Sequence, residues 1–108
     1  MKDLMGLMKQ AKEMQEKMKV AQGLVADIVV EGSSGSGLVR IELVGGGNMR
    51  TLKIDPSLFG SADQDDVEMA EDLIVAAYQD AKIKLDQATA KTMKDTMGDI
   101  PLLSLIHI

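Results

Sequence analysis

Lysine side chains recur at helical spacing in two segments of this 108-residue chain. Ammonium groups spaced in this way can bind phosphate groups, because a row of positive charges is attracted to a phosphate backbone. The same spacing is typical of a solvated helix face, on which lysines pair with acids four residues away, as Asp80 would with Lys84 or Lys91 with Asp95. From the pattern alone we favour the solvated face, since most helix surfaces carry such a mixture. The candidate phosphate-binding residues of the two helical segments are Lys2, Lys9, Lys12, Lys19, Lys84, Lys91 and Lys94. Arg40 and Arg50, in predicted strands, are weaker candidates, since each could instead pair with a strand carboxylate such as Glu42.

Two short motifs resemble ligand-binding loops but lack the residues that would hold the ligand. Gly32 and Gly37 have the spacing of a phosphate-binding loop, but Leu38 follows where such a loop needs Lys. A flexible turn between strands is the better interpretation. The acids in 63–66 resemble part of a Ca²⁺ loop, but no glycine occupies the sharp turn and no glutamate closes the site. A helix cap explains them better, so we expect no metal site.

Residue counts exclude further kinds of site. The chain has no cysteine, which rules out disulfides, thiolate metal ligands and cysteine nucleophiles. Its single histidine, His107, lies at the C-terminal end, where a histidine-based catalytic centre is implausible. No Ser/His/Asp set or carboxylate pair stands out. We therefore expect that the protein is not an enzyme and uses no cofactor and no small-molecule substrate.

Composition predicts one folded domain with a thin core. Apolar residues make up 45 % and charged residues 27 %, and the net charge of −5 is unlike that of a strongly basic DNA-binding domain. Phe59 and Tyr78 are the only aromatic residues, so a lone monomer would bury little and we expect an oligomer. No apolar run reaches the roughly 18 residues of a membrane span, and no leader pattern opens the chain. We expect a cytoplasmic protein without a membrane partner.

An apolar stripe predicts a first helix over about residues 3–22, which Gly23 should weaken at its end. The stripe repeats at alternating spacings of three and four, as in a helix that packs along a partner. We call it the apolar seam. Its members are Leu4, Leu7, Ala11, Met14, Met18, Ala21 and Val25.

Three short segments, at about 26–31, 38–44 and 49–54, predict strands separated by glycine-rich turns. In the second segment Val39, Ile41 and Leu43 share one face, which we expect to be buried in the core or in a dimer. Three strands joined by short turns predict an antiparallel meander. Such a sheet needs a cover on one face, which helices can supply.

The second half of the chain predicts a capped turn followed by a long helix. Asp55 and Pro56 are typical of a short helical turn over 55–59. Residues 66–96 contain no Gly or Pro and have a helical period. Seven acids and no base lie in 55–72, so the rest of a chain of charge −5 has a net charge of +2.

The last six residues, 103–108, read LSLIHI and have no period. This string is the translation of a widely used transposase sequencing adapter, so we hypothesise that it is not native and that a single domain spans 1–102. The alternative is a genuine apolar docking tail.

Four stretches together resemble the YbaB/EbfC family of nucleoid-associated proteins. They are MKQAKEMQEKM at 8–18, GSGLVRI at 35–41, IDPSLF at 54–59 and EMAEDLIVAAYQDA at 68–81. Each is weak alone, but they occur in order over about residues 4–98. Members of the family usually end in a Gly/Pro-rich tail, which residues 98–101 begin here.

The resemblance implies an α+β fold of the order α-β-β-β-α, forming a tweezer-like homodimer in the bacterial cytoplasm. It also implies binding of duplex DNA with low sequence specificity and a role in nucleoid organisation or gene regulation. The acidic balance does not support DNA binding, but attraction to phosphates is local, and a dimer could gather its bases away from 55–72. The alternative is a helical dimer that acts on other proteins without contacting DNA.

Overall fold

The computed structural model describes residues 3–60 and 64–98 of the chain. Lys2 and the suspected adapter segment 103–108 lie outside the described residues. The elements follow the expected α-β-β-β-α order, and the three strands form an antiparallel sheet in the order β1-β2-β3, which confirms the α+β meander. The α-helices and strands are α1 (Asp3–Ala26), β1 (Val29–Ser34), β2 (Val39–Val44), β3 (Met49–Ile54) and α2 (Gln64–Met97).

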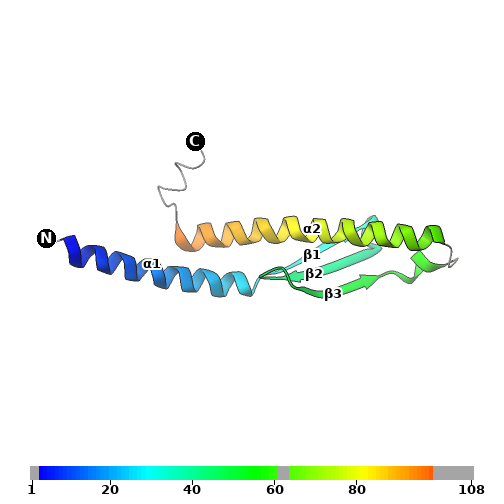
Figure 1. Cartoon of the computed structure of the whole chain (residues 1–108). Coiled ribbons are helices and arrows are strands. Elements are labelled where there is room, and N and C mark those ends of the chain that lie inside the picture. The colour runs from blue at the N-terminus through cyan, green and yellow to red at the C-terminus, as the bar shows by residue number, and fades with distance from the viewer. Residues whose placement is uncertain (1–2, 61–63, 99–108) are drawn as a thin grey trace, which may run out of the picture.

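Helix α2 is the longest element and contacts α1, β1 and β2. Its first part packs on one face of β1 and β2, and its last part runs antiparallel to α1 (Figure 1). Helix α1 continues away from the sheet, so its N-terminal half extends past the end of α2 (Figure 1). The result is an elongated body of 76 × 29 × 17 Å, which has little interior for its length.

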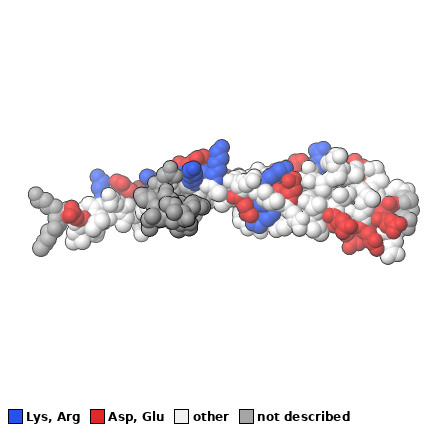
Figure 2. Space-filling model, turned by 90° about the horizontal axis from the view of Figure 1, so that it is seen from above, with Lys and Arg blue, Asp and Glu red and all other residues white. Residues whose placement is uncertain are grey.

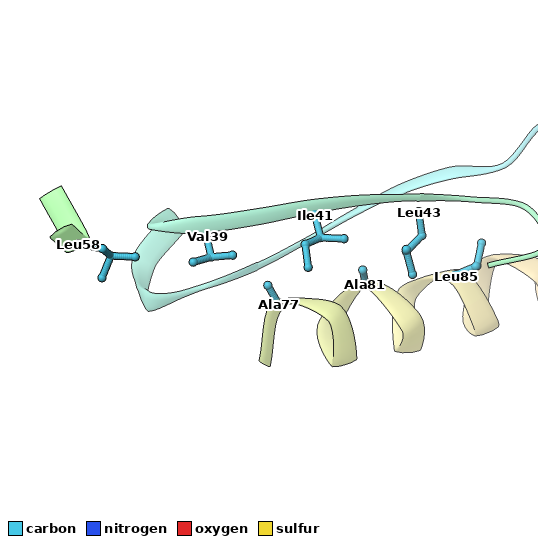
Figure 3. Close-up of a cluster of buried hydrophobic side chains, with 7 residues drawn as sticks. All are labelled: Val39, Ile41, Leu43, Leu58, Ala77, Ala81 and Leu85. Carbon is cyan, nitrogen blue, oxygen red and sulfur yellow. The ribbon is translucent and has the colours of Figure 1, made fainter. Parts of the chain in front are cut away.

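The core lies between β2 and α2 (Figure 3). Val39, Ile41 and Leu43 alternate along β2 with no exposed surface, because every second side chain of a strand points to the same face. Ala77 and Ala81 face them from α2. Their small side chains allow the helix axis to come close to the sheet. Leu58 and Leu85 close the two ends of this cluster.

The first strand is displaced from the predicted position. We expected a strand at 26–31 with Gly32 in the turn after it, but β1 spans Val29–Ser34 and Gly32 pairs with Ile41 inside the sheet. The reason is contact with α2: a Cβ on Gly32 would collide with the backbone of Ala77 and would lie 2.6 Å from Ala81 Cα. Glycine is therefore required in the strand because no side chain fits beneath the helix.

Helix α1 also ends later than predicted, at Ala26 rather than near residue 22. Gly23 costs helix stability but breaks no hydrogen bond. The last turn is closed by the N–H groups of Asp27 and Ile28, which donate to the carbonyls of Leu24 and Val25 at 3.2 and 3.1 Å. Gly45 comes so close to Val25 that a Cβ would collide with its carbonyl. Tertiary contact with the β2–β3 turn thus holds this end of the helix.

The short turn η2 (Pro56–Phe59) follows β3 and has the expected cap. The Asp55 carboxylate accepts a hydrogen bond from the N–H of Ser57 at 2.9 Å, and Pro56 occupies the first turn. This hydrogen bond holds the pKa of Asp55 below its ordinary value. The cap directs the chain so that Leu58 is buried against the core.

We expect Gly32→Ala to lower the free energy of unfolding by about 1–3 kcal/mol or to prevent folding, because α2 would have to move off the sheet. The matched control is Gly23→Ala, where a Cβ meets nothing within 4 Å. It should raise the free energy of unfolding by about 0.5–1 kcal/mol through helix propensity. Urea denaturation of both variants measures the difference. Equal stability of the two variants would contradict this account of β1.

Candidate nucleic-acid interface

Three lysines of α1 lie on a side of the helix that faces away from the apolar seam. Lys9, Lys12 and Lys19 share one face, because residues three, seven and ten apart return to nearly the same side of an α-helix. All three are exposed. None forms an ion pair within residues 3–60 and 64–98. Their ammonium groups are therefore available to an external anion.

The lysines of α2 divide into a paired and an unpaired group. Lys82 donates to Asp86 at 2.7 Å, which raises the pKa of Lys82, and Lys84 donates to Asp80 at 2.9 Å, as the sequence pattern predicted. The predicted pair of Lys91 with Asp95 does not form in the described part of the chain. Lys91 and Lys94, near the end of α2, are exposed and unpaired there.

Lys84, although a candidate, is used to hold α2 against β1. Its ammonium group also donates to the carbonyl of Glu31 at 3.2 Å. The same Asp80 oxygen that it contacts accepts from the N–H of Ser33 at 3.0 Å. The pKa of Asp80 is lowered, first by the Ser33 hydrogen bond and then by Lys84. Lys84 is thus less available for a ligand than the unpaired lysines.

The two arginine candidates lie on the sheet, away from the lysines of α1. Arg40 is on the face of β2 opposite the core, and Arg50 is exposed on β3 beside the irregularity in the β2–β3 pairing. We expected that each could pair with a strand carboxylate such as Glu42. Glu42 instead accepts from the hydroxyl of Thr51 at 2.8 Å.

The unpaired lysines of the two helices belong to the same end of the molecule. Thr96 of α2 lines a hollow of about 430 Å³ together with Glu13, Lys17 and Val20 of α1. The C-terminal end of α2 therefore lies against the middle of α1, and Lys91 and Lys94 are within two turns of that contact.

Five of the eight acidic residues of α2 lie within its first nine residues, at the opposite end, while Asp80, Asp86 and Asp95 lie further along. Figure 2 shows red atoms gathered where α2 begins, with blue and red atoms mixed over the rest of the length. Glu68 and Lys91 are separated by about 35 Å along the helix at 1.5 Å per residue. This is several times the screening length of about 8 Å at physiological salt. The acids that begin α2 therefore do not prevent an anion from approaching Lys91 and Lys94.

Comparison with known proteins agrees with these observations. The family described as the YbaB/EbfC DNA-binding family matches residues 1–100 of the chain. The chain belongs to this family. A nucleoid-associated protein of Gluconobacter oxydans (strain 621H) is 53 % identical over 102 residues, covering 94 % of this chain and 92 % of the relative. A nucleoid-associated protein of Rhizobium meliloti (strain 1021) is 46 % identical with the same coverage.

A solved structure shares the fold of this chain. An uncharacterized protein from Helicobacter pylori aligns with a TM-score of 0.70 at 20 % identity, covering 89 % of this chain and 98 % of that one. The family and the names of the relatives indicate nucleoid-associated DNA-binding proteins and not enzymes, as the residue counts predicted.

The described residues contain neither a cluster of potential metal ligands nor a membrane-spanning helix. No group of three potential metal ligands occurs in 3–60 and 64–98. Neither α1 nor α2, as described, has an apolar stretch long enough to cross a membrane.

Sequence reasoning missed the tertiary contacts of two residues, Asp80 and Lys53. The sequence pattern indicated that Asp80 is a surface acid. Its carboxylate also accepts a hydrogen bond from the N–H of Ser33 in β1, 47 residues away in the sequence. Lys53 was not a candidate, yet it lies directly opposite Arg40 in the sheet. The alternation of 49–54 signals that Lys53 points outward, but the partner across the strands depends on the register.

We expect Asp80→Ala to lower the melting temperature at pH 7, because it removes the contact that ties β1 to α2. The lowered pKa means that this stabilisation is fully present above the ordinary value of 3.8 and is lost as the pH falls through the lower folded pKa. The difference from the wild type should therefore shrink below about pH 3.8. Thermal melts across pH measure it. Asp86→Ala, which breaks only an exposed pair, is the control and should cost less; equal losses would contradict the role of Asp80.

Proposed function

We propose that this chain forms a homodimer that binds duplex DNA with low sequence specificity and serves in nucleoid organisation or gene regulation. The observation that carries the proposal is the separation of charge along the molecule. Lysines without a carboxylate partner lie on α1 and on the last turns of α2, about 35 Å from the acids that begin α2. A nucleoid location in the cytoplasm follows from this partner.

Low specificity follows from the type of these side chains. Lys9, Lys12 and Lys19 on α1 and Lys91 and Lys94 on α2 bind phosphates as point charges. Reading of base edges in the major groove typically uses bidentate groups such as those of Arg, Asn and Gln. Phosphate contacts position a protein on the duplex without selecting a sequence.

A second copy of the chain is the proposed partner of the apolar seam. Leu4, Leu7, Met14 and Met18 are 65, 59, 47 and 43 % exposed in the single chain, and in α1 only Ala21 is buried. A hollow of about 300 Å³ at the edge of this surface is lined by Met14, Gln15, Met18 and Lys19, so Lys19 borders the apolar seam. A two-fold dimer would cover the same surface on both copies while leaving Lys9 and Lys12, on the opposite side of α1, in solvent.

The alternative is a dimeric module that binds other proteins and not DNA. The observation in its favour is the exposed methionines of α1, since flexible methionine surfaces adapt to several partners. The measurements below separate the two functions.

We expect the wild-type protein to sediment as a dimer at micromolar concentration. Met14→Glu should raise the dissociation constant of the dimer at least about tenfold, because a carboxylate would be buried without a partner. Lys9→Glu, on the opposite face of α1, is the matched control and should leave the dimer intact. A well-folded wild-type monomer in sedimentation velocity would refute the dimer.

We expect the double reversal Lys9→Glu and Lys12→Glu to weaken binding to unrelated duplexes by similar factors. Four phosphate contacts per dimer would be lost, so the slope of log affinity against log salt should flatten by about 3.6. Fluorescence anisotropy over a range of salt measures both. The control Glu68→Gln with Glu71→Gln should change affinity less than about twofold at 0.15 M salt, because those acids are beyond the screening length. Absence of a duplex shift at low salt, or an unchanged slope in the reversal variant, would favour the protein-binding alternative.

A further inference from the structure

Two cations stand side by side on the face of the sheet that α2 does not cover. Arg40 and Lys53 are directly opposite each other in the β2–β3 pairing, and both are exposed. Val39 and Ile41, the neighbours of Arg40, are buried against α2, so Arg40 points to the other face. Like charges directly opposite each other destabilise a sheet. A negative charge beside Arg40 and Lys53 would therefore stabilise the sheet.

No carboxylate of the described residues forms an ion pair with Arg40 or Lys53. The ion pairs of 3–60 and 64–98 are Lys82 with Asp86 and Lys84 with Asp80, both on α2. Glu42, in the next row of the same sheet face, accepts from Thr51 and forms no ion pair with Arg40. Asp55 is nearer to Lys53 along the chain, but its carboxylate accepts from the N–H of Ser57.

The two cations border a hollow of about 230 Å³. It is lined by Gly37, Leu38, Arg40, Lys53, Ile54 and Asp55. Gly37 contributes to the space, since a Cβ there would lie 3.2 Å from Nη2 of Arg40. A water molecule occupies about 30 Å³ of the liquid, so the hollow has room for a tetrahedral oxyanion with part of its hydration.

We propose that Arg40 and Lys53 bind one phosphate group in this hollow. The guanidinium supplies two parallel donors to a pair of phosphate oxygens, and the ammonium supplies a point charge. Glu31 and Glu42 face each other in the adjacent row of the sheet. This acidic row limits the site to a single phosphate and prevents a longer track across the sheet.

The phosphate can come from two sources. One is the backbone of a duplex, in which case the site is an additional DNA contact and rests on the proposed function. The other is a free phosphate compound, which needs no DNA binding. The test therefore has one arm for each source.

In the first arm, inorganic phosphate is titrated into the protein at low ionic strength and backbone amide resonances are followed by NMR. We expect saturable shifts at residues 37–40 and 53–55 in the wild type. The double variant Arg40→Gln with Lys53→Gln should lower the affinity for phosphate at least about tenfold, because charge-assisted hydrogen bonds are lost. Lys82→Gln, an exposed lysine on α2, is the control and should leave the shifts unchanged. A wild type without saturable shifts, or a double variant that keeps them, would overturn the site.

In the second arm, the same variants are titrated with duplex DNA over a range of salt. Loss of one phosphate contact per protomer should flatten the salt slope by about 1.8 for a dimer. This result identifies the duplex as the source. An unchanged slope together with lost phosphate shifts supports the site with a free phosphate compound as its ligand. If the wild type binds no duplex, the proposed function fails while the first arm still decides the site. Thermal melts and the single variant Arg40→Gln verify that the loss is not due to unfolding.

Discussion

The close approach of β1 and α2 is the contact on which the rest of the structure depends. At Gly32 the strand passes the helix with no side chain between the two backbones, and Ala77 and Ala81 provide the small surface that this requires. Beside this contact Asp80 accepts from the N–H of Ser33 and from Lys84. Packing and polar contacts thus hold the sheet to one helix. The buried face of β2 follows, because its alternating side chains then lie between the sheet and α2.

This contact also determines how the charges are distributed. With its first part on the sheet, α2 carries its acidic start to one end of an elongated body and its unpaired lysines to the other, beside α1. The lysines in the middle of α2 are paired with acids one turn away. In a compact protein of net charge −5, acids and bases would be within a few screening lengths of one another. Here the shape separates the five acids that begin α2 from Lys91 and Lys94, although Glu13, Glu16 and Asp95 lie near the lysines of this end.

Because the molecule is elongated, a single chain leaves part of its apolar surface exposed to solvent. Helix α1 projects beyond α2 and exposes most of its apolar seam, which a structure of this thickness cannot cover by itself. The seam lies opposite Lys9 and Lys12 on α1, while Lys19 borders the seam. The dimer and the DNA contacts that we propose at Lys9 and Lys12 therefore use different surfaces of α1 and do not compete.

Local patterns determined the element types, their order and much of the core. Alternation along β2 predicted which three side chains are buried, and Asp55 with Pro56 predicted the η2 turn, because these signals depend on neighbouring residues alone. Only the tertiary structure decided that Gly32 belongs to a strand, that α1 continues past Gly23, and that Lys84 donates to the carbonyl of Glu31 in β1. Each of these depends on contacts with residues distant in sequence. The pairing of Arg40 with Lys53 across the sheet has the same origin, since strand register follows from packing against α2 and from turn geometry.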